Sequence, residues 1–203
     1  GDIDPNEWDA LVPDAHPFLL HAFLLALEES RSVGADTGWE PLYLTARTQE
    51  GALVAALPNY VKYNSYGEYV FDHAWANGFE RAGGHYYPKF LTAIPFTPVP
   101  GPRLLSREHN PQLAGAMGAA LTELAQNNDI SSAHINFLSD ADRAVLDTQG
   151  WMIRKGVQFH WHNHGYQQFD DFLAALSSRK RKNIRKERKR LTDDGVRLLQ
   201  LTG

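Results

Sequence analysis

The 203-residue sequence contains no cysteine and only two methionines. The lack of cysteine excludes a disulfide-stabilised scaffold, a zinc site with thiolate ligands and a cysteine nucleophile. A continuous apolar run of about 18 residues, the length that indicates a transmembrane helix, is also missing. Residues 1–8 lack the basic and then apolar order of a signal peptide. Together these absences favour a cytoplasmic protein without a transmembrane segment.

The formal charge of −4 hides an uneven distribution along the chain. Nine of the 20 Lys and Arg residues lie between Arg179 and Arg190, where Glu187 is the one acid. Without that segment the chain has 11 basic and 23 acidic residues, a charge of −12. This asymmetry indicates either a polyanionic partner or a junction at which an acidic domain ends and another begins.

Hydrophobic spacing predicts a chain of alternating helices and strands. We predict helices over residues 17–30, 79–93, 110–127, 140–148, 170–176 and 178–193. We predict strands over residues 41–47, 52–63, 68–75, 132–138, 152–161 and 196–201. Residues 95–102 hold four of the eleven prolines and are expected to form an extended loop or an edge strand. This order predicts an α/β or α+β fold with a mixed sheet.

The basic segment 178–193 is the first candidate site. Ile184 and Leu191 continue an apolar stripe, so the helix can pack on a core while it presents its bases to a ligand. Guanidinium groups match phosphate oxygens bidentately, which predicts contacts with a nucleotide, tRNA or cell-wall precursor. The alternative is a solvated helix whose charges pair with the acidic body. The candidate phosphate or carboxylate contacts here are Arg179, Lys180, Arg181 and Arg185.

The second candidate is the histidine-rich stretch around Trp161. In a strand, His160, His162 and His164 would lie on one face, an arrangement typical of metal sites. No carboxylate motif accompanies them, and Gly165 indicates that the strand ends there. We therefore predict no metal site. The histidines are expected to lie in a polar cleft or to form no site at all. Gln158 and Trp161 are candidate substrate-binding residues in this stretch.

The third candidate is an aromatic and polar cluster over residues 60–89. Tyrosines supply stacking area and hydroxyl donors, which suits a groove for a sugar or a peptide. The alternative is a sheet whose faces are simply aromatic. The candidate substrate-binding residues from this cluster and the segment after it are Tyr66, Tyr69, Trp75, Lys89, Phe96 and Arg103.

Eight strings of the sequence form a recognisable set: Pro17–Leu24, Ser65–Asp72, Tyr86–Lys89, Pro95–Pro98, Gly101–Arg103, Gln158–Trp161, Phe169–Leu173 and Ser178–Arg185. Together they resemble the bacterial Fem-like family of peptidoglycan biosynthesis/recognition proteins, in the GNAT (acyl-CoA N-acyltransferase) superfamily. The resemblance implies two tandem GNAT-like domains, each with a mixed, mostly antiparallel central sheet flanked by helices. Residues 1–163 would form the first, and residues 164–203 the start of a second whose remainder lies outside this chain.

The resemblance also implies a reaction class. Relatives that build peptidoglycan cross-bridges transfer an aminoacyl group from aminoacyl-tRNA to an amine of a cell-wall precursor, whereas other GNAT proteins use acyl-CoA. The GNAT pyrophosphate loop, [R/Q]-x-x-G-x-[G/A], is not matched, because the nearest string, Arg31–Asp36, ends in Asp and follows the wrong element. We therefore expect no cofactor in this chain, and acyl-CoA or aminoacyl-tRNA as the donor, with tRNA and the missing C-terminal domain as partners.

Transfer to an amine needs a base for its proton and donors for the oxyanion. By residue type, the candidate bases are Asp72, His73 and His160, and the candidate acids are Tyr86 and Tyr87. The second hypothesis is a non-catalytic module with a degenerate GNAT fold that recognises a peptide, glycan or precursor. A histidine-metal enzyme is the third.

Overall fold

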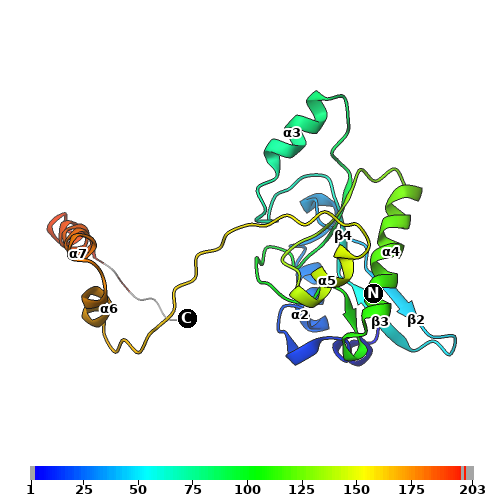
Figure 1. Cartoon of the computed structure of the whole chain (residues 1–203), viewed down its shortest axis with the longest axis horizontal. Helices are drawn as coiled ribbons and strands as arrows, with labels where there is room; N and C mark the ends of the chain where they lie inside the picture. Colours follow the sequence, from blue (N-terminus) through cyan, green and yellow to red (C-terminus); the bar gives the residue numbers. More distant parts are fainter. Residues whose placement is uncertain (1–2, 198, 200–203) are drawn as a thin grey trace. The chain divides into compact units, whose positions relative to one another are not determined.

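A computed structural model describes residues 3–197 and 199, and the chain divides into two compact units, residues 1–156 and 157–203 (Figure 1). The first unit carries three short 3₁₀ turns, at Pro13–Ala15, Ala35–Thr37 and Arg107–His109. Its helices are α1 (Pro5–Asp9), α2 (His21–Glu29), α3 (His73–Arg81), α4 (Pro111–Asn127) and α5 (Asp140–Asp147). Its strands are β1 (Glu40–Pro41), β2 (Leu44–Arg47), β3 (Leu53–Leu57), β4 (Asn59–Lys62), β5 (Lys89–Thr92), β6 (Leu105–Ser106) and β7 (Ala133–Ile135).

These strands form two sheets, of order β1-β4-β5-β7 and β2-β3-β6. Every pairing is antiparallel except that of β5 with β7. Pro58 separates β3 from β4, and because proline has no N–H it interrupts the ladder at that point. Mixed, mostly antiparallel sheets flanked by helices make a GNAT-like α+β fold, which confirms the predicted fold class.

Helix α4 covers one face of both sheets. It begins where Pro111 follows its N-cap Asn110, whose Oδ1 accepts hydrogen bonds from the backbone N–H groups of Gln112 and Leu113 at 2.9 and 3.2 Å. Its buried stripe of Ala114, Met117, Leu121 and Ala125 packs in one cluster with Leu57 of β3 and Phe90 of β5. A side chain at Gly118 would lie 2.9 Å from Leu146 of α5, so glycine permits this close approach of the helices.

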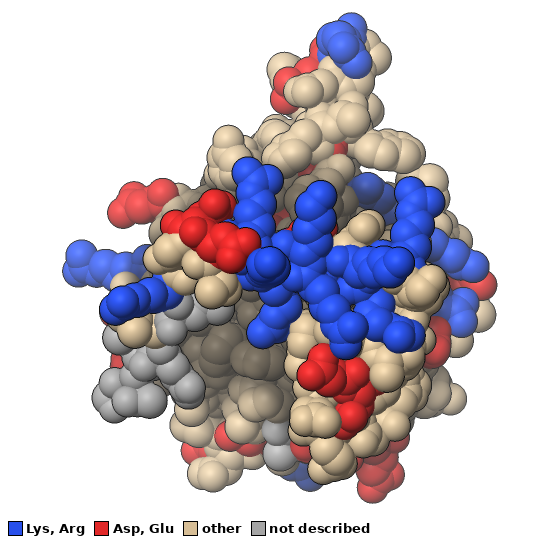
Figure 2. Space-filling model, turned by 90° about the vertical axis from the view of Figure 1, so that its left-hand side faces the viewer, with Lys and Arg blue, Asp and Glu red and all other residues tan. Residues whose placement is uncertain are grey.

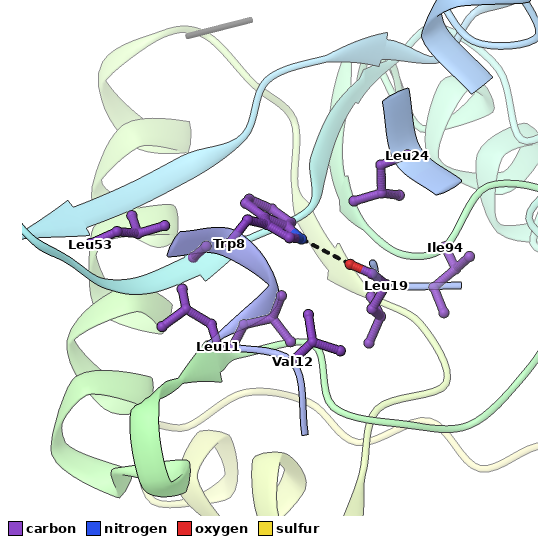
Figure 3. Packing of buried hydrophobic residues seen from close by; sticks show 9 residues of the cluster. Trp8, Leu11, Val12, Leu19, Leu24, Leu53 and Ile94 are labelled. Atoms are coloured by element: carbon purple, nitrogen blue, oxygen red, sulfur yellow. Dashed lines mark hydrogen bonds between the residues drawn. The ribbon is translucent and has the colours of Figure 1, made fainter. Parts of the chain in front are cut away.

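The other face of β3 packs against the N-terminal helices (Figure 3). Trp8 is 1% exposed, and its indole Nε1 donates a hydrogen bond to the carbonyl oxygen of Leu19 at 2.8 Å. The register of β2 on β3 shifts at Arg47, which pairs with Leu53. The remaining buried members of this cluster are Leu11, Val12, Leu24, Leu53, Ala56, Ile94 and Leu105.

The second unit contains two helices among its described residues, α6 (Phe169–Ala175) and α7 (Ser178–Asp193). A capping box between Gln168 and Asp171 begins α6. Arg181 of α7 ties the helices together, since its guanidinium donates to the carbonyl oxygens of Leu173, Ala174 and Leu176 at 2.9, 3.0 and 3.0 Å.

The predicted helices over residues 110–127, 140–148, 170–176 and 178–193 are confirmed within a residue or two, and that over residues 17–30 is confirmed in its central part. The strand over residues 68–75 and the helix over residues 79–93 are wrong. A helix, α3, instead begins at His73, and Gly83 and Pro88 separate it from strand β5.

The strand predicted over residues 152–161 is also wrong. This stretch has no regular structure, and Met152 and Phe159 are 93% and 97% exposed, so it buries little that would hold it in a ladder. The strand predicted over residues 196–201 includes residues 198, 200 and 201, which lie outside the described residues.

Candidate functional site

A buried ionic cluster lies where β5 begins. Lys89 Nζ donates hydrogen bonds to Asp72 Oδ2 at 2.7 Å, Glu68 Oε2 at 2.9 Å and Ser65 Oγ at 3.0 Å. The Tyr86 hydroxyl donates to the same Asp72 oxygen at 2.8 Å. The side chains of Lys89 and Glu68 are fully inaccessible and that of Asp72 is 2% exposed. We call Ser65, Glu68, Asp72, Tyr86 and Lys89 the Lys89 cluster.

The sheet register brings a second lysine to this end of the strands. Lys62 of β4 is the antiparallel partner of Lys89, and both residues are fully buried. Lys62 Nζ lies 3.8 Å from the centroid of the Trp39 ring and donates to the carbonyl oxygen of Tyr66 at 3.3 Å. Burial lowers the pKa of Lys62 to about 7, although the Glu68 carboxylate opposes this shift.

Burial and hydrogen bonding separate the two carboxyl groups of the cluster. Burial raises the pKa of both, but in Asp72 the hydrogen bonds from Lys89 and Tyr86 prevail and lower the pKa to about 2. In Glu68 burial prevails over Lys89, so the pKa is raised. Glu68 Oε1 and Asp72 Oδ1 are buried and accept no hydrogen bond from the described residues.

Tyr86 of the cluster and His134 beside it are both neutral at pH 7. Burial and the bond to Asp72 raise the pKa of the Tyr86 phenol. Burial, followed by the nearby charge of Lys89, lowers the pKa of His134 to about 4. The ring of His134 lies edge-on to that of Tyr86, with centroids 6.0 Å apart. Tyr86 itself is half-buried, so the residue that contacts the buried Asp72 also reaches the surface.

Exposed aromatic side chains adjoin the cluster in the segment that ends in α3. We call this segment, residues 66–79, the aromatic arm; in Figure 1 its helix stands apart from the two sheets. Tyr69 and Phe71 have φ angles of 59° and 51°, in the left-handed region that side chains disfavour. The exposed rings of the arm are Tyr66, Tyr69, Phe71, Trp75 and Phe79, with exposed fractions of 49–77%.

Of the residues predicted for a site, Asp72, Tyr86, Tyr87 and Lys89 lie together. The Tyr87 hydroxyl is 2.8 Å from Ser65 Oγ, the same hydroxyl that Lys89 contacts. His73 follows Asp72 directly and is exposed, with its ring 6.3 Å from that of Tyr66.

The candidates Phe96 and Arg103 lie elsewhere in the first unit. The Phe96 ring packs against Trp39, with centroids 5.3 Å apart. Arg103 is fully buried, and its guanidinium donates to the carbonyl oxygens of Val99 and Pro102 at 2.6 and 3.0 Å. The structure therefore gives Arg103 a role in holding the proline-rich loop.

The remaining candidates belong to the second unit. His160 Nε2 is 3.2 Å from Gln158 Oε1, and the ring of Trp161 meets that of Phe172 at 6.3 Å. Arg179 and Lys180 are exposed, Arg185 Nη2 is 3.5 Å from Asp170 Oδ1, and Arg181 is occupied by the carbonyl groups of α6. Within the described part of the chain, no group of three or more His, Asp or Glu residues is arranged to hold a metal ion.

Comparison with protein-family models gives a match over the whole chain. A family model for peptidoglycan biosynthesis/recognition, FemAB-like, matches residues 1–203. The chain belongs to the FemAB-like family. Comparison of this FemAB-like chain with curated proteins and with solved structures found no match. Membership of this family assigns the chain a role in peptidoglycan biosynthesis or recognition. None of the helices in its described residues is long and apolar enough to cross a membrane.

Four polar residues of this FemAB-like site were not among the predicted ones. Ser65 lies between two predicted strands and Glu68 at the start of the second, and their contacts with Lys89 need the loop that is actually present. His134 is a lone histidine in a short strand, a pattern that does not distinguish a site from a core. Lys62 carried a usable signal, because a lysine within an apolar strand must find a partner for its charge.

Proposed function

We propose that this FemAB-like chain binds an amine-bearing peptidoglycan precursor and takes part in transferring an acyl or aminoacyl group to that amine. The observation that carries this proposal is the Tyr86 hydroxyl, which is held by the buried Asp72 beside the exposed aromatic arm. Family membership supplies the substrate class, and the arrangement of these side chains supports where the amine binds.

The hydrogen-bond direction explains why Tyr86 suits an amine. Its O–H donates to Asp72, so the lone pairs of its oxygen remain to accept a hydrogen bond from an ammonium or amine N–H. Lys89 fixes the carboxylate and thereby positions the phenol. The rings of the aromatic arm offer stacking surface for the sugar or stem peptide of the precursor.

In the proposed transfer, the unprotonated amine nitrogen attacks the carbonyl carbon of the acyl donor. A C–N bond forms, the bond from that carbon to the donor oxygen or sulfur breaks, and the amine proton ends on the released hydroxyl or thiol. The donor is an aminoacyl-tRNA ester or an acyl-CoA thioester. A base matched to neutral pH would speed the loss of this proton.

Recognition without transfer is the second candidate, and the pKa values of Asp72 and His134, the two groups beside the Tyr86 ring and hydroxyl, favour it. Asp72, with a pKa of about 2, and His134, with a pKa of about 4, are both weak bases at neutral pH. The Asp72 carboxylate therefore attracts and orients a bound ammonium group through Tyr86 more readily than it removes a proton from it. The two candidates share the binding site and differ only in whether a bond is formed.

Titration calorimetry with a nucleotide-linked muropeptide that carries a free side-chain amine tests the shared step. Tyr86→Phe should weaken binding roughly tenfold, because a hydrogen bond to a charged group is lost. Tyr63→Phe, an exposed tyrosine outside the aromatic arm, is the matched control. N-acetylation of the ligand amine should abolish the difference between the wild-type protein and Tyr86→Phe.

Incubation of the same muropeptide with aminoacyl-tRNA or acyl-CoA, followed by mass spectrometry, then separates the candidates. A mass increase on the amine supports transfer. Tight binding without such an increase supports recognition. If the wild-type protein does not bind the muropeptide, or binds it equally well after N-acetylation, both candidates are wrong.

A further inference from the structure

A groove of about 440 Å³ lies between α6 and α7. The bonds from Arg181 to three carbonyl groups of α6 hold its two walls together. One wall contributes the Phe169 ring, and the other contributes two arginines one helical turn apart. The residues that line the groove are Gln168, Phe169, Asp170, Leu173, Arg185 and Arg188.

The charge of α7 is poorly compensated by the protein. Its sixteen residues include nine bases and two acids. Bases at i and i+4, such as Lys182 and Lys186, face each other along the helix and repel. Among the residues that the structure describes, ion pairs on α7 reach acids only from Arg185 and Arg190, each at 3.5 Å and each largely exposed. An anionic ligand would relieve this repulsion. Figure 2 shows Lys and Arg side chains gathered on one face of the protein.

Within the groove, Arg188 is already oriented for such a ligand. Its guanidinium carbon lies 4.2 Å from the centroid of the Phe169 ring, so the ring fixes the guanidinium plane and leaves the N–H edges for a partner. Arg185, three residues earlier on α7, lines the same groove. Two such forks on one side of a helix can each engage one of two linked phosphates.

We infer that the groove between α6 and α7 binds the diphosphate group of an organic diphosphate, with Arg185 and Arg188 as its anion contacts. Phe169, which is 42% exposed, supplies apolar surface for the organic part beside the phosphates. A nucleoside diphosphate and a lipid diphosphate both present this chemistry. The inference goes beyond the proposed function and stands whether or not acyl transfer occurs.

Asp170 makes the inference sharper because its carboxylate competes with an anion. Its Oδ1 lies 3.5 Å from Arg185 Nη2, and 72% of its side chain is exposed, so a bound phosphate would displace it. Asp170→Asn should therefore tighten diphosphate binding. Glu187→Gln on α7 makes the same change in the net charge of the chain but lies outside the groove lining, and should change the affinity much less.

The experiment is calorimetric titration of the full chain at fixed ionic strength with inorganic pyrophosphate, UDP and farnesyl diphosphate. Arg185→Gln and Arg188→Gln should each weaken pyrophosphate binding about tenfold or more. The matched variants Lys186→Gln and Lys189→Gln, which lie outside the groove lining, should weaken it less than threefold. Circular dichroism verifies that each variant keeps its helices. Tighter binding of UDP or of farnesyl diphosphate than of pyrophosphate identifies the organic part.

Three results would overturn the inference. Equal losses in the groove and outer-face variants would mean diffuse attraction by the whole helix. Equal affinity for sulfate and pyrophosphate would remove the preference for two linked phosphates. Tight tRNA binding that depends on Lys186 and Lys189, without measurable pyrophosphate binding, would assign the helix to nucleic acid instead. None of these results bears on Tyr86 and the amine, so this inference and the proposed function fail separately.

Discussion

Replacing Lys89 with methionine tests whether the Lys89 cluster is held by charge. Lys89 is fully buried, and its ammonium group compensates two carboxylates at 2.7 and 2.9 Å. Lys89→Met keeps most of the side-chain volume but leaves Glu68 and Asp72 buried without that charge. Removing one partner of a buried ion pair costs about 3–5 kcal/mol. Because whole domains unfold at about 5–15 kcal/mol, this change should bring the first unit close to unfolding at neutral pH.

The loss should depend on pH in a definite direction. Without Lys89, burial raises the pKa values of both carboxyl groups in the folded state above their values of about 4 in the unfolded chain. The unfolded state then releases protons more readily, so the destabilisation grows as the pH rises from about 4 toward the raised pKa values. Between pH 4 and pH 8, the free energies of unfolding of the wild-type and variant proteins should therefore differ least at pH 4.

Urea denaturation followed by the fluorescence of the buried Trp8 and Trp39 measures these differences at pH 4.5, 6 and 8. The triple variant Lys89→Met, Glu68→Gln, Asp72→Asn removes all three charges and should recover most of the lost free energy of unfolding. If Lys89→Met costs less than about 1 kcal/mol at pH 8, or the same amount at every pH, the cluster is not held by charge. The triple variant keeps the test decisive should the single variant fail to fold.

Three further predictions concern other contacts. The folded-state pKa of Lys62 is about 7 against an ordinary 10.5, so the wild-type free energy of unfolding should rise between pH 7 and 10. Urea denaturation at a series of pH values should show that Lys62→Met flattens this rise. Asn110→Ala removes the acceptor at the start of α4 and should lower the unfolding free energy by about 1 kcal/mol, where an unchanged urea midpoint would count against the cap. Arg181→Gln should release the end of α6 by about 1 kcal/mol, seen as faster amide hydrogen exchange in α6, whereas Lys186→Gln should leave that exchange unchanged.

The sequence predicted those elements whose local signals agree with their tertiary setting. Helix α4 has Asn110 and Pro111 at its start and a regular apolar stripe, so its limits could be read directly. The prediction fails over residues 68–88 because several large aromatic residues there do not face a core. Tyr69, Phe71, Trp75 and Phe79 are exposed whereas Glu68 and Asp72 are buried, which inverts the pattern that such predictions assume.

Only part of the candidate site could be predicted for a similar reason. Asp72, Tyr86 and Lys89 could be chosen by residue type, because ionisable and aromatic residues concentrate there. That they contact one another follows from the pairing of β4 with β5 and from a loop conformation that no periodicity encodes. Arg181 is a case in which the residue type misleads. An arginine predicts a ligand contact, but the position of Arg181 lets it join α7 to α6 through hydrogen bonds to carbonyl oxygens.

The left-handed backbone of Tyr69 and Phe71 implies a trade-off between stability and function. Each such residue other than glycine costs about 1 kcal/mol or more, and glycine would remove that strain. Both rings are at least half exposed, so burial in this chain does not offset the cost. Selection for folding alone would therefore favour glycine at both positions. The two rings therefore stand available for contacts outside the chain, at the expense of a more stable protein.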